Sequence, residues 1–188
     1  MKYSNVYIET MIKHYKELNK FKSESKIIDR QLKLLLLEDC DIKPNLKKIK
    51  WSSLLLKTKW WPILEKNKEN CIITGSVALF AFGLINRNPE NLDLIKLNKC
   101  NIPGEVIDMQ YSSDNINNNL IQTTKHKNLV IHLFLSQNEE TINHEGFIFQ
   151  NPFEILRTKL KIYLEDGPLK HYYDIEEWFN RRNTYQNP

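Results

Sequence analysis

Residues 72–83 read Ile72-Ile73-Thr74-Gly75-Ser76-Val77-Ala78-Leu79-Phe80-Ala81-Phe82-Gly83. The β-branched run before Gly75 is typical of a buried strand, and the apolar run after Ser76 is typical of a helix. A strand that turns into a helix at Gly-Ser points backbone N–H groups at whatever lies above the turn, and glycine lets a phosphate approach closely. This stretch therefore predicts a strand, a tight turn and a helix, with a candidate phosphate site at the turn.

A second motif follows. Residues 87–94 read Arg87-Asn88-Pro89-Glu90-Asn91-Leu92-Asp93-Leu94. Side chains two residues apart in a strand point to the same face, so Asn91 and Asp93 are expected to share one. The connector of 14 residues between the Gly-Ser pair and Asn91 is somewhat long, and a register shifted by one residue makes Glu90 the nearest acid. In a purely structural alternative, Asp93 pairs with Arg87 or with a lysine near the carboxyl terminus.

The rest of the chain divides into helical and strand-like parts. Short runs typical of strands lie at residues 71–74, 92–97, 106–109, 128–135 and 147–150. From Pro152 onward the pattern is helical with one break at residues 166–168, and before residue 70 apolar residues also repeat at helical spacing. We therefore expect an α+β fold, with a helical extension over residues 1–69 and a domain over residues 70–184 that ends in two helices.

The carboxyl-terminal segment adds a third motif. It reads Phe149-Gln150-Asn151-Pro152-Phe153-Glu154-Ile155-Leu156-Arg157-Thr158-Lys159-Leu160, followed by Leu169-Lys170-His171-Tyr172-Tyr173-Asp174-Ile175. Together with the Gly-Ser turn and the Asn-Leu-Asp strand, this motif resembles the nucleotidyltransferase superfamily, most closely the abortive-infection type toxin transferases and their small minimal relatives. The resemblance covers roughly residues 70–180 and implies a mixed β-sheet flanked by helices.

The resemblance also implies where a nucleotide and metal ions bind. In that family the Gly-Ser turn holds a triphosphate, and two strand carboxylates with a third on a later strand hold two Mg²⁺ ions. It assigns nucleotide binding to Gly75, Ser76, Lys159 and Lys170, and the catalytic and metal-binding role to Asp93. In the simpler interpretation, Ser76 caps the helix and the lysines join the terminal helices to each other through Asp174.

The chain departs from the family at the metal carboxylates. Asn91 stands where the first carboxylate is expected, and His132 stands where the third is expected, so only Asp93 is retained. Two-metal phosphoryl transfer needs several anionic oxygens, because Mg²⁺ keeps its water unless carboxylates and phosphates replace it. The sequence therefore predicts loss of the transferase reaction, although a hydrogen-bonded core histidine is the simpler interpretation of His132.

Charge is distributed unevenly along the chain. Residues 1–70 carry 16 Lys and Arg against 9 Asp and Glu, whereas residues 71–188 carry 11 against 14. The basic part contains clustered tryptophans, a composition suited to contact with nucleic-acid phosphates and bases or with a protein partner. The candidate contact residues are Lys47, Lys48, Lys50, Trp51, Trp60 and Trp61. A solvated helical face above core tryptophans is the simpler alternative.

The cysteines and the hydropathy of the chain indicate in which cellular compartment the protein is expected. Cys40, Cys71 and Cys100 form neither a disulfide framework nor a zinc motif, so we expect free, buried thiols in a reducing compartment. The sequence opens without a signal-peptide pattern, and its longest apolar runs fall far short of the ~20 residues that span a bilayer. We therefore expect a cytoplasmic protein with no membrane partner.

The sequence thus favours a catalytically degenerate nucleotidyltransferase-like protein that acts as a binding or scaffold subunit. We expect it to require no cofactor and to bind a protein partner, with a nucleotide or nucleic acid as a further ligand. The resemblance implies a bacterial defence or toxin–antitoxin setting. One alternative is an active transferase that uses Mg²⁺ and a nucleoside triphosphate to modify RNA or protein. The other is nucleic-acid binding through the basic amino-terminal part.

Overall fold

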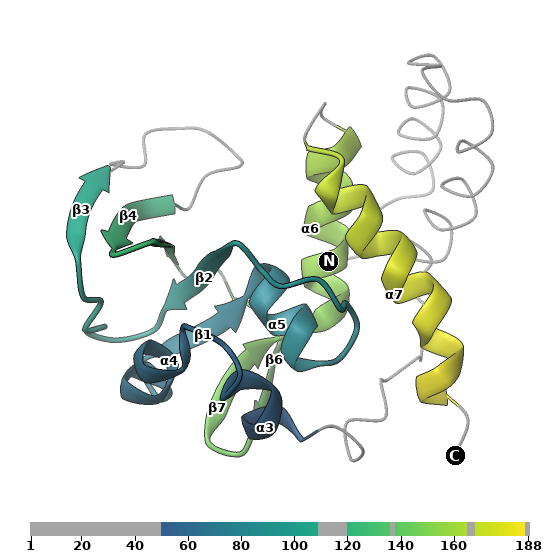
Figure 1. Ribbon diagram of the computed structural model, residues 1–188, viewed down its shortest axis with the longest axis horizontal. Helices are drawn as coiled ribbons and strands as arrows, with labels where there is room; N and C mark the ends of the chain where they lie inside the picture. The colour runs from purple at the N-terminus through teal and green to yellow at the C-terminus, as the bar shows by residue number, and fades with distance from the viewer. Residues whose placement is uncertain (1–49, 109–119, 136–137, 165–167, 187–188) are drawn as a thin grey trace. The chain divides into compact units, whose positions relative to one another are not determined.

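A computed structural model describes residues 50–108, 120–135, 138–164 and 168–186 (Figure 1). These residues fall into two compact units that divide within helix α6 (Pro152–Leu164), after Ile155, and each unit is described by itself. The helices expected before residue 50 lie outside the described residues, as do Cys40, Lys47 and Lys48. None of the described helices is long and apolar enough to cross a membrane.

The unit that ends at Ile155 is built on a seven-stranded mixed β-sheet. Its strands are β1 (Cys71–Thr74), β2 (Asn91–Lys96), β3 (Glu105–Asp108), β4 (Leu120–His126), β5 (Leu129–Leu135), β6 (Thr141–His144) and β7 (Phe147–Gln150). Their order in space is β3-β4-β5-β2-β1-β7-β6. The β1–β7 and β2–β5 pairs are parallel, and all other neighbours in this sheet are antiparallel. The α+β fold expected from the sequence is confirmed.

Strands β4 and β6 have no counterpart among the strands expected from the sequence. Both are rich in polar residues, including Thr123 and Thr124 in β4 and Asn143 in β6. They form because each pairs along its length with a more apolar neighbour, β4 with β5 and β6 with β7. Strand formation depends on this cross-strand context more than on local propensity, and a local pattern does not contain it.

The pairing register assigns side chains to two faces of the sheet, because directly paired residues point to the same side. Ile73 on β1 is paired with Phe149 on β7, and both are buried. Thr74, the next residue along β1, is paired with Asp93, and Asp93 is paired with His132. Since side chains alternate along a strand, the site residues lie on the face opposite Phe149.

Three short helices belong to the same unit: α3 (Trp51–Leu55), α4 (Trp61–Asn67) and α5 (Gly75–Ala81). The ring centroid of Trp51 lies 4.3 Å from that of Phe82, just after α5, and 4.6 Å from that of Phe149. All three rings are fully buried, and such aromatic pairs contribute about 0.5–1.5 kcal/mol beyond their burial. Trp51 lies in the stretch that the sequence assigned to an amino-terminal extension. It is nevertheless part of the core of the unit that contains the β-sheet.

The β6–β7 hairpin holds the start of α3. Its turn residues, Glu145 and Gly146, have positive φ angles of 49° and 80°, as a two-residue hairpin requires. The Glu145 carboxylate accepts a hydrogen bond from the backbone N–H of Ser52 at 3.1 Å, and so satisfies a donor at the helix start. Hydrogen bonds from the side chain and the backbone of Ser52 lower the pKa of Glu145 below its ordinary value of 4.5.

The second unit contains the described helices α6, from Leu156 onward, and α7 (Lys170–Gln186). Within it, Nζ of Lys159 lies 2.8 Å from Oδ2 of Asp174, and the exposed fractions of these side chains are only 6% and 0%. The simpler interpretation of the sequence, that a lysine and an aspartate join the terminal helices, is confirmed for this pair.

Cys71 and Cys100 form a disulfide, so the expectation of free thiols is wrong for these two cysteines. Cys71 begins β1, and its antiparallel partner is Lys96, the last residue of β2. This pairing brings the connection that follows β2 next to Cys71. The sequence separation of 29 residues does not reveal that neighbourhood.

Glu145→Gln should lower the free energy of unfolding at neutral pH by less than about 1 kcal/mol, because the side chain is 40% exposed and solvent screens its charge. A carboxyl whose folded-state pKa is lowered stabilises the protein above its unfolded pKa, and loses that contribution as the pH falls through the folded pKa. The difference from the wild type should therefore be largest at neutral pH and disappear once the pH falls below the lowered folded-state pKa. Urea unfolding at neutral pH and in a series of acidic buffers measures it, with Glu65→Gln on α4 as an exposed control. A difference that does not depend on pH would contradict this assignment.

Candidate functional site

The strand-to-helix turn predicted from the sequence is present. β1 ends at Thr74, and α5 begins at Gly75, whose φ of +63° lies in the left-handed region that glycine adopts without strain. The Thr74 hydroxyl donates to Oε1 of Gln150 on β7 instead of capping the helix. Ser76 is the second helical residue and not the N-cap, and its Oγ accepts a hydrogen bond from Nη2 of Arg87 at 2.8 Å.

Gly75 is required by the position of Asp93. A Cβ atom at residue 75 would lie 3.0 Å from Cγ of Asp93 and only 2.2 Å from its Oδ2, and the second distance is shorter than real Cβ contacts. The missing side chain therefore lets the Asp93 carboxylate lie directly against the first residue of α5. The sequence suggested a close approach of phosphate to this glycine; the structure shows a close approach of a carboxylate.

Asp93 is hydrogen-bonded to His132. Oδ1 of Asp93 lies 2.9 Å from Nδ1 of His132, and about a quarter of each side chain is exposed (26% and 25%). An ionised carboxylate only accepts hydrogen bonds, so it pairs with the tautomer of His132 that carries its proton on Nδ1. The predicted placement of Asp93 on a strand beside the turn, with His132 on the next strand, is confirmed.

Asp93 and His132 belong to a row of polar side chains that crosses the sheet. Direct pairing joins Thr123 on β4 to His132, His132 to Asp93, and Asp93 to Thr74. The hydrogen bond from Thr74 to Gln150 extends the row to β7. No sequence pattern identifies Thr123, Thr74 and Gln150 as site residues, because the row takes one residue from each of five strands and no local motif contains it.

The residues at the expected metal positions do not fit two Mg²⁺ ions. Asn91 lies two residues before Asp93 on the same face of β2, and His132 lies opposite Asp93 on β5. These positions therefore offer one amide, one carboxylate and one imidazole, whereas Mg²⁺ prefers several anionic oxygens. Among the described residues, no group of three or more His, Cys, Asp and Glu side chains is arranged to hold a metal ion.

The two lysines expected to bind nucleotide lie in the second unit. Lys159 is buried in its ion pair with Asp174, and Lys170 is the first residue of α7. A buried lysine that already has a carboxylate partner is expensive to separate from it, because an uncompensated buried charge costs several kcal/mol. The geometry of Lys159 is therefore that of a residue joining two helices.

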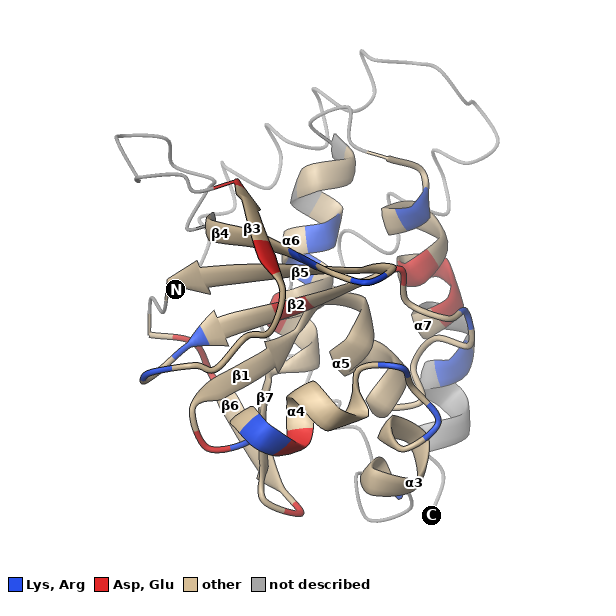
Figure 2. Cartoon of the chain, turned by 60° about the vertical axis from the view of Figure 1, so that its left-hand side comes forward, with Lys and Arg blue, Asp and Glu red and all other residues tan. Residues whose placement is uncertain are grey.

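The tryptophans of the basic part contribute to the core. Trp51 is 0% and Trp60 is 2% exposed, which corrects the expectation that their rings stack on nucleic-acid bases. Trp61 is half-buried, with its ring centroid 5.4 Å from that of Phe147 on β7. Lys50 is exposed, and acidic and basic residues lie next to each other on α4 (Figure 2). This part of the chain therefore has the features of a solvated face above core tryptophans.

Comparison of the chain with protein-family models, with curated proteins and with solved structures finds no match. The resemblance to the nucleotidyltransferases therefore rests on the sequence motifs alone.

Gly75→Ala should destabilise the protein for two reasons, the positive φ and the overlap with Asp93. Gly146→Ala provides a matched control with the first reason only, because its Cβ would be 3.7 Å from the nearest atom, Nζ of Lys68. The loss of unfolding free energy should be larger for Gly75→Ala by about 1 kcal/mol or more. Urea unfolding of both variants measures the difference.

Asp93→Ala in the Gly75→Ala background tests the cause of this difference. Removing the carboxylate eliminates the two closest contacts of the new Cβ, so the double variant should recover part of the lost stability. Equal losses for the two glycine variants, or additive losses in the double variant, would contradict the contact between Gly75 and Asp93.

Proposed function

We propose that this chain is a catalytically degenerate nucleotidyltransferase-like protein, which binds a ligand or partner and does not transfer nucleotides. The observation that best supports this proposal is the 2.9 Å hydrogen bond between Asp93 and His132. By the resemblance, His132 occupies the place of the third metal carboxylate, and Asn91 the place of the first. A histidine that is hydrogen-bonded to the remaining carboxylate thus stands where the family has another anion.

The number of negative charges at this site favours binding over catalysis. Two-metal transfer brings two divalent cations and a triphosphate together, and several carboxylates are needed to hold the cations. Asp93 supplies one negative charge, and its Oδ1 already accepts a hydrogen bond from His132. Imidazole suits softer ions such as Zn²⁺ better than Mg²⁺. The donor set thus favours a site that functions without Mg²⁺.

One feature beside the turn at Gly75 suits a phosphate ester. The Arg87 guanidinium lies 2.8 Å from Oγ of Ser76, the second residue of α5. Arginine is well matched to phosphate oxygens, because its planar donors form paired hydrogen bonds with them. A nucleotide bound weakly and without metal is therefore the small ligand that we propose. The protein partner, the cytoplasmic location and the defence or toxin–antitoxin setting follow from the sequence and the resemblance alone.

The purified protein should transfer no label from any of the four ribonucleoside triphosphates to RNA or to protein, in either Mg²⁺ or Mn²⁺. The reason is that one carboxylate does not organise two metal ions. Incubation with α-³²P-labelled triphosphates followed by gel electrophoresis measures transfer. Labelling that Asp93→Ala abolishes would overturn the proposal and support the active transferase.

Asn91→Asp combined with His132→Asp should create a metal-dependent stability that the wild type lacks. Three carboxylates on one face repel each other without metal, which destabilises the fold and raises at least one carboxyl pKa. Divalent ions should then restore stability by RT ln(1 + [L]/Kd), about 2.7 kcal/mol at a hundredfold excess over Kd. Thermal unfolding with EDTA and with Mg²⁺ measures this effect in both proteins. Equal responses would show that positions 91 and 132 are not at a vacated metal site.

A further inference from the structure

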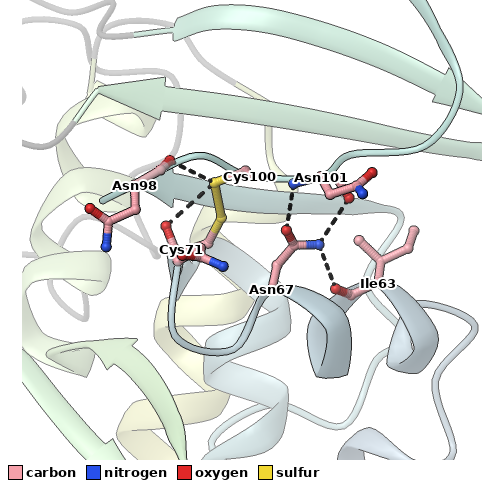
Figure 3. Close-up of a disulfide and its surroundings, with 7 residues drawn as sticks. Ile63, Asn67, Cys71, Asn98, Cys100 and Asn101 are labelled. Carbon is pink, nitrogen blue, oxygen red and sulfur yellow. Dashed lines mark hydrogen bonds between the residues drawn. A yellow bond between two sulfur atoms is a disulfide. The ribbon is translucent and has the colours of Figure 1, made fainter.

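The Cys71–Cys100 disulfide connects the first residue of β1 to the connection between β2 and β3 (Figure 3). The two cysteine residues differ in exposure. Cys71 is 2% exposed, whereas Cys100 is partly exposed. An incoming thiolate must reach a sulfur atom in line with the S–S bond, so exchange with solvent thiols is expected at Cys100.

The surroundings of Cys100 also suit a reduced thiol. Its Sγ lies 3.4 Å from the carbonyl oxygen of Asn70 and 3.5 Å from that of Asn98. A disulfide sulfur carries no hydrogen and makes no use of these acceptors, whereas a thiol at this place donates to either of them. The reduced state therefore finds hydrogen-bond partners that are already in position.

The connection around Cys100 is held in place by contacts that do not depend on the disulfide (Figure 3). The buried Asn67 side chain accepts a hydrogen bond from the backbone N–H of Asn101 at 2.7 Å, and donates to the Asn101 carbonyl at 3.1 Å and to the Ile63 carbonyl at 2.9 Å. The backbone N–H groups of Leu97 and Asn98 both donate to the Asn70 carbonyl. After reduction the two thiols therefore stay near each other, at a high effective concentration for closing the bond again.

We propose that Cys71 and Cys100 are a reversible dithiol–disulfide pair, which exchanges with low-molecular-mass thiols such as glutathione at Cys100. In the first step a glutathione thiolate attacks Sγ of Cys100, the S–S bond breaks, and Cys71 leaves as a thiolate that takes up a proton. A second glutathione thiolate attacks the glutathione sulfur of the mixed disulfide, which releases Cys100 and oxidised glutathione. The two electrons that reduce the protein disulfide come from the two glutathione molecules.

A redox titration tests reversibility. Cys40→Ser removes the third thiol from the assay, and the protein is equilibrated in glutathione buffers of varied [GSH]²/[GSSG] ratio, starting from both oxidised and reduced samples. Alkylation followed by mass spectrometry gives the oxidised fraction. We expect one midpoint from both directions, with a cooperatively folded reduced state. A folded protein that keeps its disulfide at about 10 mM GSH, or whose thiols never join in GSSG, would overturn the proposal.

Two variants, one on α4 and one in the connection after β2, test the role of the surrounding contacts. Asn67→Ala removes the side chain that holds Asn101, so the midpoint ratio [GSH]²/[GSSG] should fall by about threefold or more as the effective concentration falls. Asn98→Ala is the matched control, because the Asn98 side chain is exposed and the backbone carbonyl near Cys100 is retained. Equal midpoints for Asn67→Ala, Asn98→Ala and wild type would contradict the preorganised pair.

Single-cysteine variants in the Cys40→Ser background test the direction of attack. With Cys71→Ala, GSSG should modify Cys100 under native conditions, whereas with Cys100→Ala the buried Cys71 should react only in urea. Brief alkylation of the reduced, otherwise native chain gives the same comparison without a substitution in β1, since peptide mass spectrometry separates the two sites. Faster modification of Cys71 than of Cys100 in both experiments would overturn the assignment of Cys100 as the exchange site.

Discussion

The antiparallel register between β1 and β2 determines both ends of the central part of the sheet. At one end Thr74 is paired with Asp93, which brings the carboxylate against Gly75 and next to His132. At the other end Cys71 is paired with Lys96, which brings the following connection to the disulfide. A slip of one residue would move Asp93 to the aromatic face and separate the site from the turn. The four residue pairs between β1 and β2 thus position both the polar site around Asp93 and the Cys71–Cys100 disulfide.

The pair formed by Asp93 and His132 satisfies hydrogen-bonding groups on this face of the sheet. A cage of three carboxylates depends on cations to offset its repulsion, because like charges close together raise the free energy of the folded state. Here a ring N–H satisfies one oxygen of the single carboxylate, and the hydroxyl of Thr74 is satisfied by Gln150. The row therefore contains its own donors and acceptors.

The sequence predicted those features that are local. The run of β-branched residues before Gly75 and the alternation around Asp93 are short patterns, and both occur in the structure with the expected bounds or within one residue of them. Long-range features were missed: the polar strands β4 and β6, the Thr74–Gln150 hydrogen bond and the disulfide all depend on which strands become neighbours. The burial of Trp51 was open for the same reason, since a tryptophan beside lysines fits a core as well as a contact surface.

Different residues set the geometry of the site and its chemistry. Gly75 fixes the geometry, because any side chain there would collide with Asp93 whatever ion or ligand is present. Positions 91 and 132 fix the chemistry, because they decide how many anions face Asp93, and the strands that carry them are paired through backbone hydrogen bonds that do not depend on side-chain charge. The turn and the strand register are therefore independent of the donor set. The proposed loss of the transferase reaction rests on the residues at 91, 93 and 132 and not on the turn.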